Sequence, residues 1–396
     1  MNKFKNFELG DLIEFQRGYD LPKSDFVKGR VPVISSNGIL GYHNEVKVKA
    51  PGITIGRSGT VGLPHFINED FFPHNTALFI KNFKGNNPKY IFYLLKSLKL
   101  NEYKSGSGVP TMNRNHLHPL KVYSTKDTVT QQKIASVLSA LDDKIELNNN
   151  INAELEQMAK TLYDYWFVQF DFPNENGKPY KSSGGKMVCN EVLKREIPDG
   201  WKNELINDLG TIIGGSTPSK AIEENFSHNG TPWITPKDLS MNSKNKFITR
   251  GEYDVSDKGL KDASLNILPA KSVLMSSRAP IGYLAINRDI CTTNQGFKSI
   301  VCNKKYSYEY VYYILNQYMP VIEANATGST FKEVSATVFK AINIIKPNKQ
   351  VVDEFVKRIS PIFQKQDNLE QQNQELASLR DWLLPMLMNG QVKVTD

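Results

Sequence analysis

The chain repeats much of its own sequence at an offset of about 220 residues. Three pairs of segments show the match: residues 52–62 with 271–282, 90–95 with 310–315, and 31–34 with 231–234 at a slightly shorter offset. Each copy ends in a long stretch of helical apolar period with few helix breakers. A two-copy repeat indicates a molecule with internal pseudo-two-fold symmetry, which can contact two separated patches of a long partner.

The repeat divides the chain into globular and helical parts. Short β-rich runs with Gly, Pro and Asn turns are typical of compact α+β domains. In the first copy, residues 53–55, 77–80 and 120–123 are predicted strands, and residues 88–97 are a predicted helix with Pro88 in its first turn. We expect a first domain (1–126), a central long helix (127–168), a linker rich in Pro, Gly and Asn (169–200), a second domain (201–346), and a distal long helix with a C-terminal tail (347–396).

Two sets of positions recur every seven residues in the central helical part. They are Ile134, Leu141, Asn148, Leu155 and Leu162, and Leu138, Ile145, Asn152, Ala159 and Trp166. Such a heptad predicts a paired helix of roughly 60 Å at about 1.5 Å per residue. The two asparagines fall at the middle of the seam, where a buried polar residue fixes register and partner. The alternative is that residues 148–150 form a turn between two shorter helices.

The distal helical part shows a similar pattern. Its positions are Phe355, Ile362, Leu369, Leu376 and Leu383, with Gln366 and Asn373 at the complementary seam. Both predicted helices are polar at the middle, so antiparallel pairing would bring their centres together and place the domains at opposite ends. Pro361 opposes this interpretation, because a proline should kink the helix or mark its first turn. Gly390 suits the C-cap of a helix that ends near Met388.

The net charge of +8 is unevenly distributed. Residues 127–168 carry three lysines against seven acidic residues, and residues 348–396 carry six basic against seven acidic, so the rest of the chain carries +13. An anionic partner at the globular parts is therefore favoured, and nucleic acid is the usual one. The beginning of the chain has no signal-peptide core, and no apolar run reaches the length of a membrane helix, so we expect a cytoplasmic protein without membrane contact.

Catalytic and cofactor motifs are not evident in the sequence. There is no Walker A pattern, and no GxGxxG follows a predicted strand. The cysteines Cys189, Cys291 and Cys302 have no CxxC spacing, and His116 and His118 have no evident third metal ligand. We expect no catalytic residue, directly bound cofactor or metal site, and a chain that binds and positions while another subunit performs the chemistry.

Polar loops recur in both copies and supply candidate DNA contacts. An arginine can bond a guanine edge bidentately, Asn and Gln suit adenine, and Gly/Ser-rich loops suit phosphate oxygens. The candidates are Arg57, Ser58 and Thr60 with Ser277 and Arg278 in the first loop, Asn75 with Asn294 and Gln295 in the second, Asn113 and Arg114 with Thr330 and Lys332 in the third, and Lys237 as a further phosphate contact. Each loop has a plain alternative as a tight turn or as a side chain that caps the backbone.

Seven motifs, taken in their order along the chain, resemble the specificity (S) subunit of type I restriction–modification systems. They are Gln-Gln-Lys-Ile-Ala at 131–135, Leu-Tyr-Asp-Tyr-Trp-Phe-Val at 162–168, Ile-Pro-Asp-Gly-Trp at 197–201, Gly-Gly-Ser-Thr-Pro-Ser at 214–219, Pro-Trp-Ile-Thr-Pro-Lys-Asp-Leu at 232–239, Thr-Asn-Gln-Gly at 293–296, and Leu-Leu-Pro-Met-Leu-Met-Asn-Gly at 383–390. One departure stands at the start of the second helix, where residues 348–353 replace a Gln-Gln-Lys-Ile-Ala equivalent.

The resemblance implies a division of labour. Each domain would read one half of a split double-stranded DNA target, and the helices would act as a ruler and as the docking surface for two methyltransferase (M) subunits. Those subunits would use S-adenosylmethionine to methylate adenine N6, and two motor–nuclease (R) subunits with ATP and Mg would join where restriction occurs. The S subunit has no catalytic residue in that family. The alternatives are a coiled-coil scaffold and a free-standing DNA-binding regulator without a methyltransferase partner.

Overall fold

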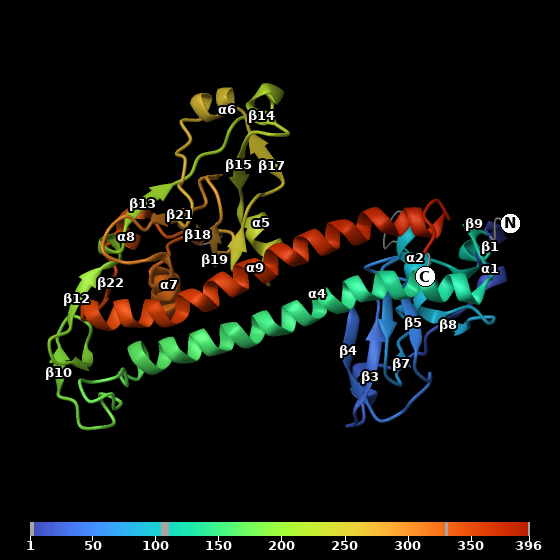
Figure 1. Ribbon diagram of the computed structural model, residues 1–396, viewed down its shortest axis with the longest axis horizontal. Helices are drawn as coiled ribbons and strands as arrows, with labels where there is room; N and C mark the ends of the chain where they lie inside the picture. The colour runs from blue at the N-terminus through green and yellow to red at the C-terminus, as the bar shows by residue number, and fades with distance from the viewer. Residues whose placement is uncertain (1–3, 104–110, 329–331, 395–396) are drawn as a thin grey trace. The chain divides into compact units, whose positions relative to one another are not determined.

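A computed structural model describes residues 4–103, 111–328 and 332–394 (Figure 1). The chain forms two compact units: unit 1 takes residues 1–147 and 373–396, and unit 2 takes residues 148–372. Each unit combines β-sheets and short helices with a part of each long helix. The predicted α+β class, with two globular domains and two long helices, is confirmed.

Unit 1 builds its globular part from two small sheets. Their strand orders are β2-β8-β5-β6 and β4-β3-β7, and β1 pairs antiparallel with β9. The strands are β1 (Lys5–Glu8), β2 (Glu14–Arg17), β3 (Val31–Ser35), β4 (Gly38–His43), β5 (Gly52–Gly56), β6 (Pro64–Ile67), β7 (Phe72–Pro73), β8 (Ala77–Asn82) and β9 (Lys121–Ser124), and the short helices are α1 (Leu9–Leu12), α2 (Pro88–Ser97) and α3 (Arg114–Leu117). The strands predicted near 53–55, 77–80 and 120–123 and the helix at 88–97 are confirmed.

Helix α2 forms because Asn87 accepts a hydrogen bond from Tyr90 N and Pro88 occupies the first turn, where no donor is lost. Its buried face, which includes Tyr90 and Leu94, joins the core of the four-stranded sheet. Ile134 and Leu138 of the central long helix and Leu387 of the distal one belong to the same core. Apolar burial therefore attaches parts of both long helices to unit 1.

Unit 2 repeats this plan and extends it. Its sheets have the orders β13-β21-β18-β19-β16 and β14-β17-β15-β20, and β12 pairs with β22. The strands are β10 (Met187–Asn190), β11 (Arg195–Pro198), β12 (Lys202–Leu205), β13 (Thr211–Gly214), β14 (Phe226–Ser227), β15 (Thr231–Ile234), β16 (Phe247–Ile248), β17 (Tyr253–Val255), β18 (Val273–Ser277), β19 (Ile281–Asn287), β20 (Thr292–Thr293), β21 (Lys298–Val301) and β22 (Asn343–Lys346), and the helices are α5 (Pro236–Met241), α6 (Asp257–Asp262), α7 (Tyr308–Ala324) and α8 (Ala336–Ala341).

The registers of the two units show the internal duplication. In unit 1, Ile34 of β3 pairs in parallel with Pro73 of β7, and in unit 2 Ile234 of β15 pairs in parallel with Thr293 of β20. The pairs β1–β9, β2–β8 and β5–β6 correspond to β12–β22, β13–β21 and β18–β19. Strands β14 and β16 with helices α5 and α6 are elements that unit 2 adds to this plan.

The segment 169–200 is folded against unit 2. Strands β10 and β11 form an antiparallel hairpin, and Phe170 and Phe172 are buried in the main core of the unit. The ring of Phe172 stacks on Trp201 with centroids 5.1 Å apart. The Pro, Gly and Asn residues that indicated a linker form the turns of this compact segment.

Two long helices run through both units along the chain. Helix α4 spans Thr128–Tyr163 and continues as a π-helical turn, Asp164–Val168, while α9 spans Lys349–Met388. Residues 148–150 are helical, so the alternative of a turn there is wrong. Pro361 lies inside α9, well after its first turn. Among the described residues, no helix is long and apolar enough to span a membrane.

The helices pair antiparallel within each unit. In unit 2, Asn148 Nδ2 donates to Gln372 Oε1 at 3.4 Å and Gln366 Nε2 donates to Asn152 O at 3.3 Å. In unit 1, Arg380 Nη1 lies 2.7 Å from Asp142 Oδ1. As the residue number rises along α4, the number of its partner in α9 falls. This is the antiparallel pairing that the polar seams predicted.

Candidate nucleic-acid interface

Three polar loops of unit 1 converge where β5 ends. The Arg57 and Ser58 amides both donate to Thr76 O, at 2.8 and 3.2 Å, and Met112 N donates to Arg57 O at 2.8 Å. Arg57 Nη1 donates to the Asn75 carbonyl at 3.4 Å. Residues from the three predicted loops therefore form one surface, the loop cluster of unit 1. The two amides at 57 and 58 are occupied by Thr76, so the side chains are the groups left to contact a ligand.

A fourth segment joins this surface, and sequence reasoning missed it. Tyr19 N donates to Pro73 O at 2.8 Å, and the Asn75 side-chain amide donates to the Asp20 carboxylate. Asp20 also lies 3.0 Å from Arg17 Nη2. The hydrogen bond from Asn75 and the nearby Arg17 lower the pKa of Asp20 below its ordinary value. An anionic acceptor thus stands beside the candidate residues.

Unit 2 repeats the hydrogen bonds of this loop cluster. Ser277 N donates to Gly296 O at 2.7 Å, Val334 N donates to Ser277 O at 3.1 Å, and Ser216 N donates to Thr293 O at 3.0 Å. The Thr217 hydroxyl donates to the side-chain Oε1 atom of Gln295. By these bonds Gln295 corresponds to Asn75, and Thr217 corresponds to Asp20.

The same correspondence separates the two arginines that the sequence had grouped together. Ser277 takes the place of Arg57, because each receives the amide of the third loop and donates its own amide to the second. Arg278 takes the place of Ser58, because the backbone of Arg278 forms an antiparallel β-bridge with Glu333, as the backbone of Ser58 does with Thr111. The two domains therefore present different chemistry at matched positions.

A glycine in each unit allows the backbones of this cluster to approach closely. A Cβ atom on Gly18 would lie 2.1 Å from His74 O, and a Cβ atom on Gly215 would lie 2.1 Å from Thr293 O. Only glycine fits such a contact without displacing the neighbouring strand. Gly215 stands in one of the recognised motifs, whereas Gly18 had no clear signal in the sequence.

The other candidates lie in varied environments. Thr60, Asn113, Arg114, Gln295 and Lys332 are exposed, and Asn75, Asn294, Arg57, Ser58 and Arg278 are half-buried. Asn113 caps α3 and Asn294 accepts a hydrogen bond from Gly296 N at 2.9 Å, as the structural alternative allowed. Ser277 is fully buried with its hydroxyl oxygen 3.2 Å from Lys298 Nζ, so a ligand at the surface does not reach it. Thr330 lies outside the described residues.

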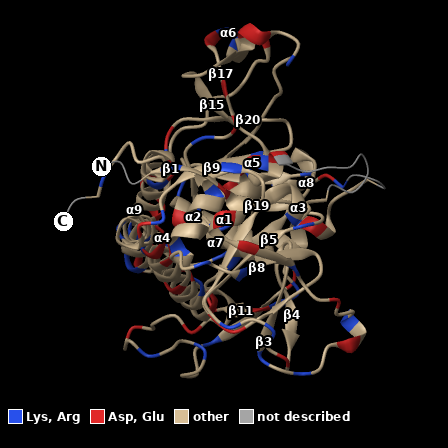
Figure 2. Cartoon of the chain, turned by 90° about the vertical axis from the view of Figure 1, so that its right-hand side faces the viewer, with Lys and Arg blue, Asp and Glu red and all other residues tan. Residues whose placement is uncertain are grey.

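Lys237 lies in α5 and forms an ion pair of 2.7 Å with Glu252. The hydrogen bond to Glu252 raises the pKa of the Lys237 ammonium group above its ordinary value. Figure 2 shows basic and acidic residues interspersed along the chain, with many basic residues near acidic ones in that view. Local pairs of this kind will decide which cations remain available to phosphates.

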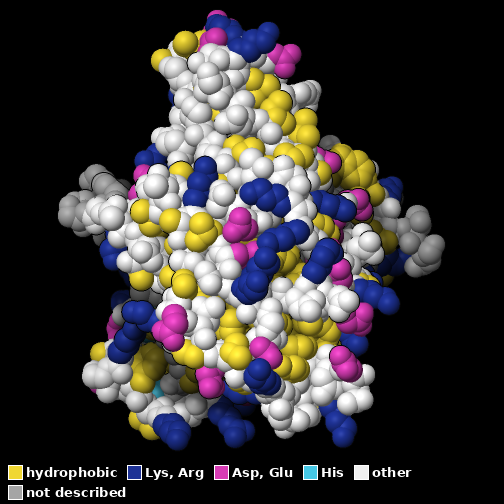
Figure 3. Space-filling model, turned by 90° about the vertical axis from the view of Figure 1, so that its left-hand side faces the viewer, with side chains coloured by type: hydrophobic (Ala, Val, Ile, Leu, Met, Phe, Trp, Pro, Cys, Tyr) yellow, Lys and Arg dark blue, Asp and Glu magenta, His cyan; other side chains and the backbone are white. Residues whose placement is uncertain are grey.

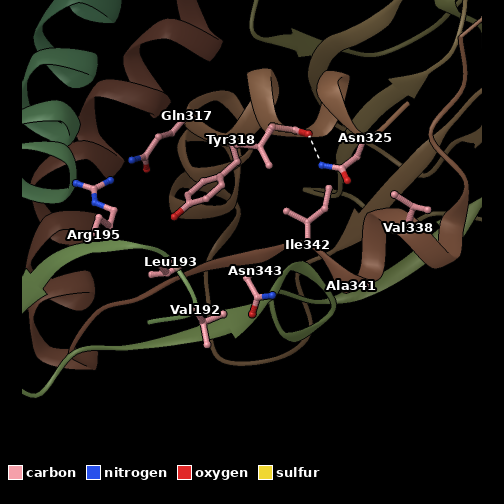
Figure 4. A pocket seen from close by; sticks show the side chains of 11 residues that line it. Val192, Leu193, Arg195, Gln317, Tyr318, Asn325, Val338, Ala341, Ile342 and Asn343 are labelled. Carbon is pink, nitrogen blue, oxygen red and sulfur yellow. Dashed lines mark hydrogen bonds between the residues drawn. The ribbon is translucent and has the colours of Figure 1, made fainter. Parts of the chain in front are cut away.

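A separate hollow lies beside the β10–β11 hairpin. This cavity of about 690 Å³ is lined by Leu193, Tyr318, Val338 and Ile342, with Arg195 and Asn325 at its edges (Figure 4). Figure 3 views the molecule from the left of Figure 1 and shows hydrophobic patches with basic side chains among them. The lining of the cavity mixes apolar side chains with Arg195, Gln317, Asn325 and Asn343, and the described candidate DNA contacts do not line it.

The described residues contain no group of three or more His, Cys, Asp or Glu side chains that could hold a metal ion. Burial raises the pKa of the Cys291 and Cys302 thiols to about 12, which makes both poor nucleophiles.

A duplicated domain with matched polar loop clusters, carried on paired long helices, defines an internally repeated two-domain protein. A family model for the type I restriction modification DNA specificity domain matches residues 1–157 and 198–378. The specificity subunit of the type I restriction enzyme HindI from Haemophilus influenzae is 30% identical in an alignment of 363 positions that covers 77% of this chain and 77% of that protein. The chain belongs to the family of type I restriction modification DNA specificity domains.

Two further comparisons agree with this assignment. The EcoR124I/EcoR124II specificity subunit of Escherichia coli is 23% identical over 379 residues, covering 89% of this chain and 84% of that protein. The crystal structure of a type I restriction–modification S subunit from M. genitalium matches with a TM-score of 0.64 at 15% identity, covering 99% of this chain and 97% of that one. The fold is therefore that of an S subunit, as the motifs predicted.

Proposed function

We propose that this chain is the DNA-recognition subunit of a type I restriction–modification complex and directs adenine-N6 methylation to a split target. Each domain reads one half of the target through its loop cluster. The observation that carries the proposal is the repetition of one hydrogen-bonded arrangement in both units, with Tyr19, Asn75 and Arg57 matched by Ser216, Gln295 and Ser277. Two copies of one reading surface suit two half-sites on a duplex.

The chain itself performs no chemistry in this proposal. Two M subunits bring S-adenosylmethionine and the methyl transfer, and R subunits, where they join, bring ATP and Mg. The exposed apolar side chains on the long helices, such as Leu147 and Met158 of α4 and Leu379 and Trp382 of α9, supply docking surface for such subunits. The chain then contributes the choice of sequence, through phosphate contacts that position it and a few base contacts that specify it.

The test is a map of N6-methyladenine in the DNA of a host that expresses this chain with its cognate M subunit. A host that expresses the M subunit alone is the control. We expect a split motif that appears only when both proteins are present. If a stable complex of the two co-purifies but no new motif appears, the scaffold alternative gains support. If the chain alone binds one site tightly and sequence-specifically, the regulator alternative gains support.

A further inference from the structure

A charged triad stands at the loop cluster of unit 2. Arg278 Nη1 lies 3.3 Å from Glu333 Oε2, and Lys298 Nζ lies 3.4 Å from Glu333 Oε1. The Lys298 side chain is only 10% exposed, whereas those of Arg278 and Glu333 are 34% and 37% exposed. A buried lysine thus holds the carboxylate from below, and the arginine holds it at the surface.

The matched positions of unit 1 carry neutral side chains. Ser58 and Thr111 form the bridge that Arg278 and Glu333 form in unit 2. The counterpart of Lys298 is Leu78, which is buried. Leu78 pairs with Arg17, the residue before Gly18. In the same way, Lys298 pairs with Gly214, the residue before Gly215. All three members of the triad therefore differ together between two otherwise matched clusters, which indicates a difference in what the two domains read.

Backbone hydrogen bonds and a close packing contact position the triad. Glu333 exchanges both backbone hydrogen bonds with Thr327, at 3.0 and 2.9 Å. The Arg278 Cγ atom lies over Gly296, 3.3 Å from where a Cβ atom of that glycine would stand. A guanidinium group has five N–H donors, and the contact with Glu333 directs the group while leaving other donors available. An arginine held in this way loses less conformational freedom on binding than a free surface arginine.

We propose that Arg278 reads a guanine in the half-target of the second domain, with Glu333 as the positioning residue that orients its guanidinium group. Guanine N7 and O6 accept the paired donors of an arginine, a geometry that no other base offers in the major groove. Lys298 offsets the charge of Glu333, so the triad keeps one net positive charge toward DNA. The first domain, with Ser58 at the matched position, reads its half without this contact. This inference rests on the proposed function.

The experiment maps N6-methyladenine in hosts that express the M subunit with the wild-type chain, Arg278→Ala, Arg278→Lys or Glu333→Gln. We expect Arg278→Ala and Arg278→Lys to relax one guanine position in one half of the motif, with discrimination falling roughly 5- to 150-fold there and the other half unchanged. Arg278→Lys keeps the positive charge but loses the planar pair of N–H donors of the guanidinium group. It therefore distinguishes a contact with the base from electrostatic attraction to phosphates. Glu333→Gln should relax the same position more weakly and add nothing to Arg278→Ala in the double variant.

Lys340→Ala is the matched control, because it removes an exposed cation from α8 of the same domain. Co-purification with the M subunit and a thermal melt show that each variant is folded. No motif from the wild-type pair would overturn the proposed function itself. A wild-type motif that persists unchanged in folded Arg278→Ala, that weakens evenly at all positions, or that has no guanine in the affected half would overturn this inference alone.

Discussion

Tyr93 Oη donates a hydrogen bond of 2.8 Å to the Asp142 carboxylate, which attaches α2 to α4 within unit 1. Asp142 also accepts from Arg380 Nη1 of α9 at 2.7 Å. In unit 2 the matched tyrosine, Tyr313 of α7, donates to Glu156 of α4 at 3.2 Å. Each recognition domain is thus bonded to the long helices by a tyrosine at the same place in the repeat.

The first prediction concerns Tyr93→Phe. Removing the hydroxyl leaves the half-buried Asp142 with fewer donors, and a hydrogen bond to a charged group contributes about 1.5–3 kcal/mol. We expect the free energy of unfolding of unit 1 to fall by that order, measured by urea denaturation of the full chain. Tyr42→Phe is the control, because that ring is exposed and its hydroxyl should matter little. Equal losses in the two variants would contradict the role given to Tyr93.

The second prediction concerns the pH dependence set by Glu370. Its carboxylate accepts from Lys246 N at 2.7 Å, Phe247 N at 3.1 Å and Arg288 Nη2 at 2.9 Å, with Asp367 nearby. Burial nevertheless raises its pKa from 4.5 to about 7, because desolvation outweighs these partners and Asp367 repels the charge.

The sign follows from proton linkage. Between pH 4.5 and about 7 the folded chain retains a proton on Glu370 that the unfolded chain has lost, so this group stabilises folding at low pH and loses that contribution as pH rises. We expect the unfolding free energy of the wild type minus that of Glu370→Gln to fall by up to about 3 kcal/mol across that window. Glu375→Gln, at an exposed position of α9, should show no such slope. A flat difference for Glu370→Gln would show that the carboxylate is already ionised at pH 5.

The third prediction uses neighbouring glycines in unit 2. Gly215→Ala would place a Cβ atom 2.1 Å from Thr293 O, so the segment that follows β13 and the end of β20 must separate. Gly214→Ala meets its nearest atom, Phe297 O, at 3.8 Å, which is an ordinary contact. We expect Gly215→Ala to reduce methylation strongly and Gly214→Ala to leave it nearly unchanged, measured as N6-methyladenine at the wild-type motif. Similar activity of the two variants would refute the close packing of the loop cluster.

The fourth prediction tests the ruler hypothesis. Seven residues inserted into α4 and seven into α9 at paired positions keep the heptad register while lengthening both helices by about 10 Å. We expect the spacing between the halves of the methylated motif to change, or methylation to be lost. A control with seven residues inserted into the β10–β11 turn changes the chain length but neither helix. Unchanged spacing in an active helix variant would exclude the ruler role.

Sequence periodicity was sufficient to predict the two long helices. Seven-residue spacing predicted α4 and α9, and the polar seam at Asn148, Asn152 and Gln366 predicted their antiparallel register, because neighbours on a helix face are set by local spacing. The same reasoning could not decide between a helix and a turn at residues 148–150, since asparagine is favoured in turns and also occurs at polar positions of helix seams. Packing against α9 decided for the helix.

The candidate site was only partly predictable. Repetition found the loops that hold Arg57, Asn75 and Arg278, but it missed Asp20, Thr217 and Glu333. These three enter the cluster through strand pairing between segments that are far apart in sequence, and such pairing leaves no local pattern. The apparent match between Arg57 and Arg278 was a matter of loop composition, and the backbone hydrogen bonds separate them.

By itself the sequence determined the duplicated domain plan, the two long helices and the family, because repeats, heptads and ordered motifs are written in local spacing. Only the tertiary structure decided which side chains meet: that Asn75 bonds Asp20, that Ser277 is buried, and that Arg278 shares Glu333 with Lys298. The physical reason is that a hydrogen bond or ion pair depends on distances of about 3 Å between atoms of distant segments. Those distances are set by the registers of whole strands and by the glycines that let them approach.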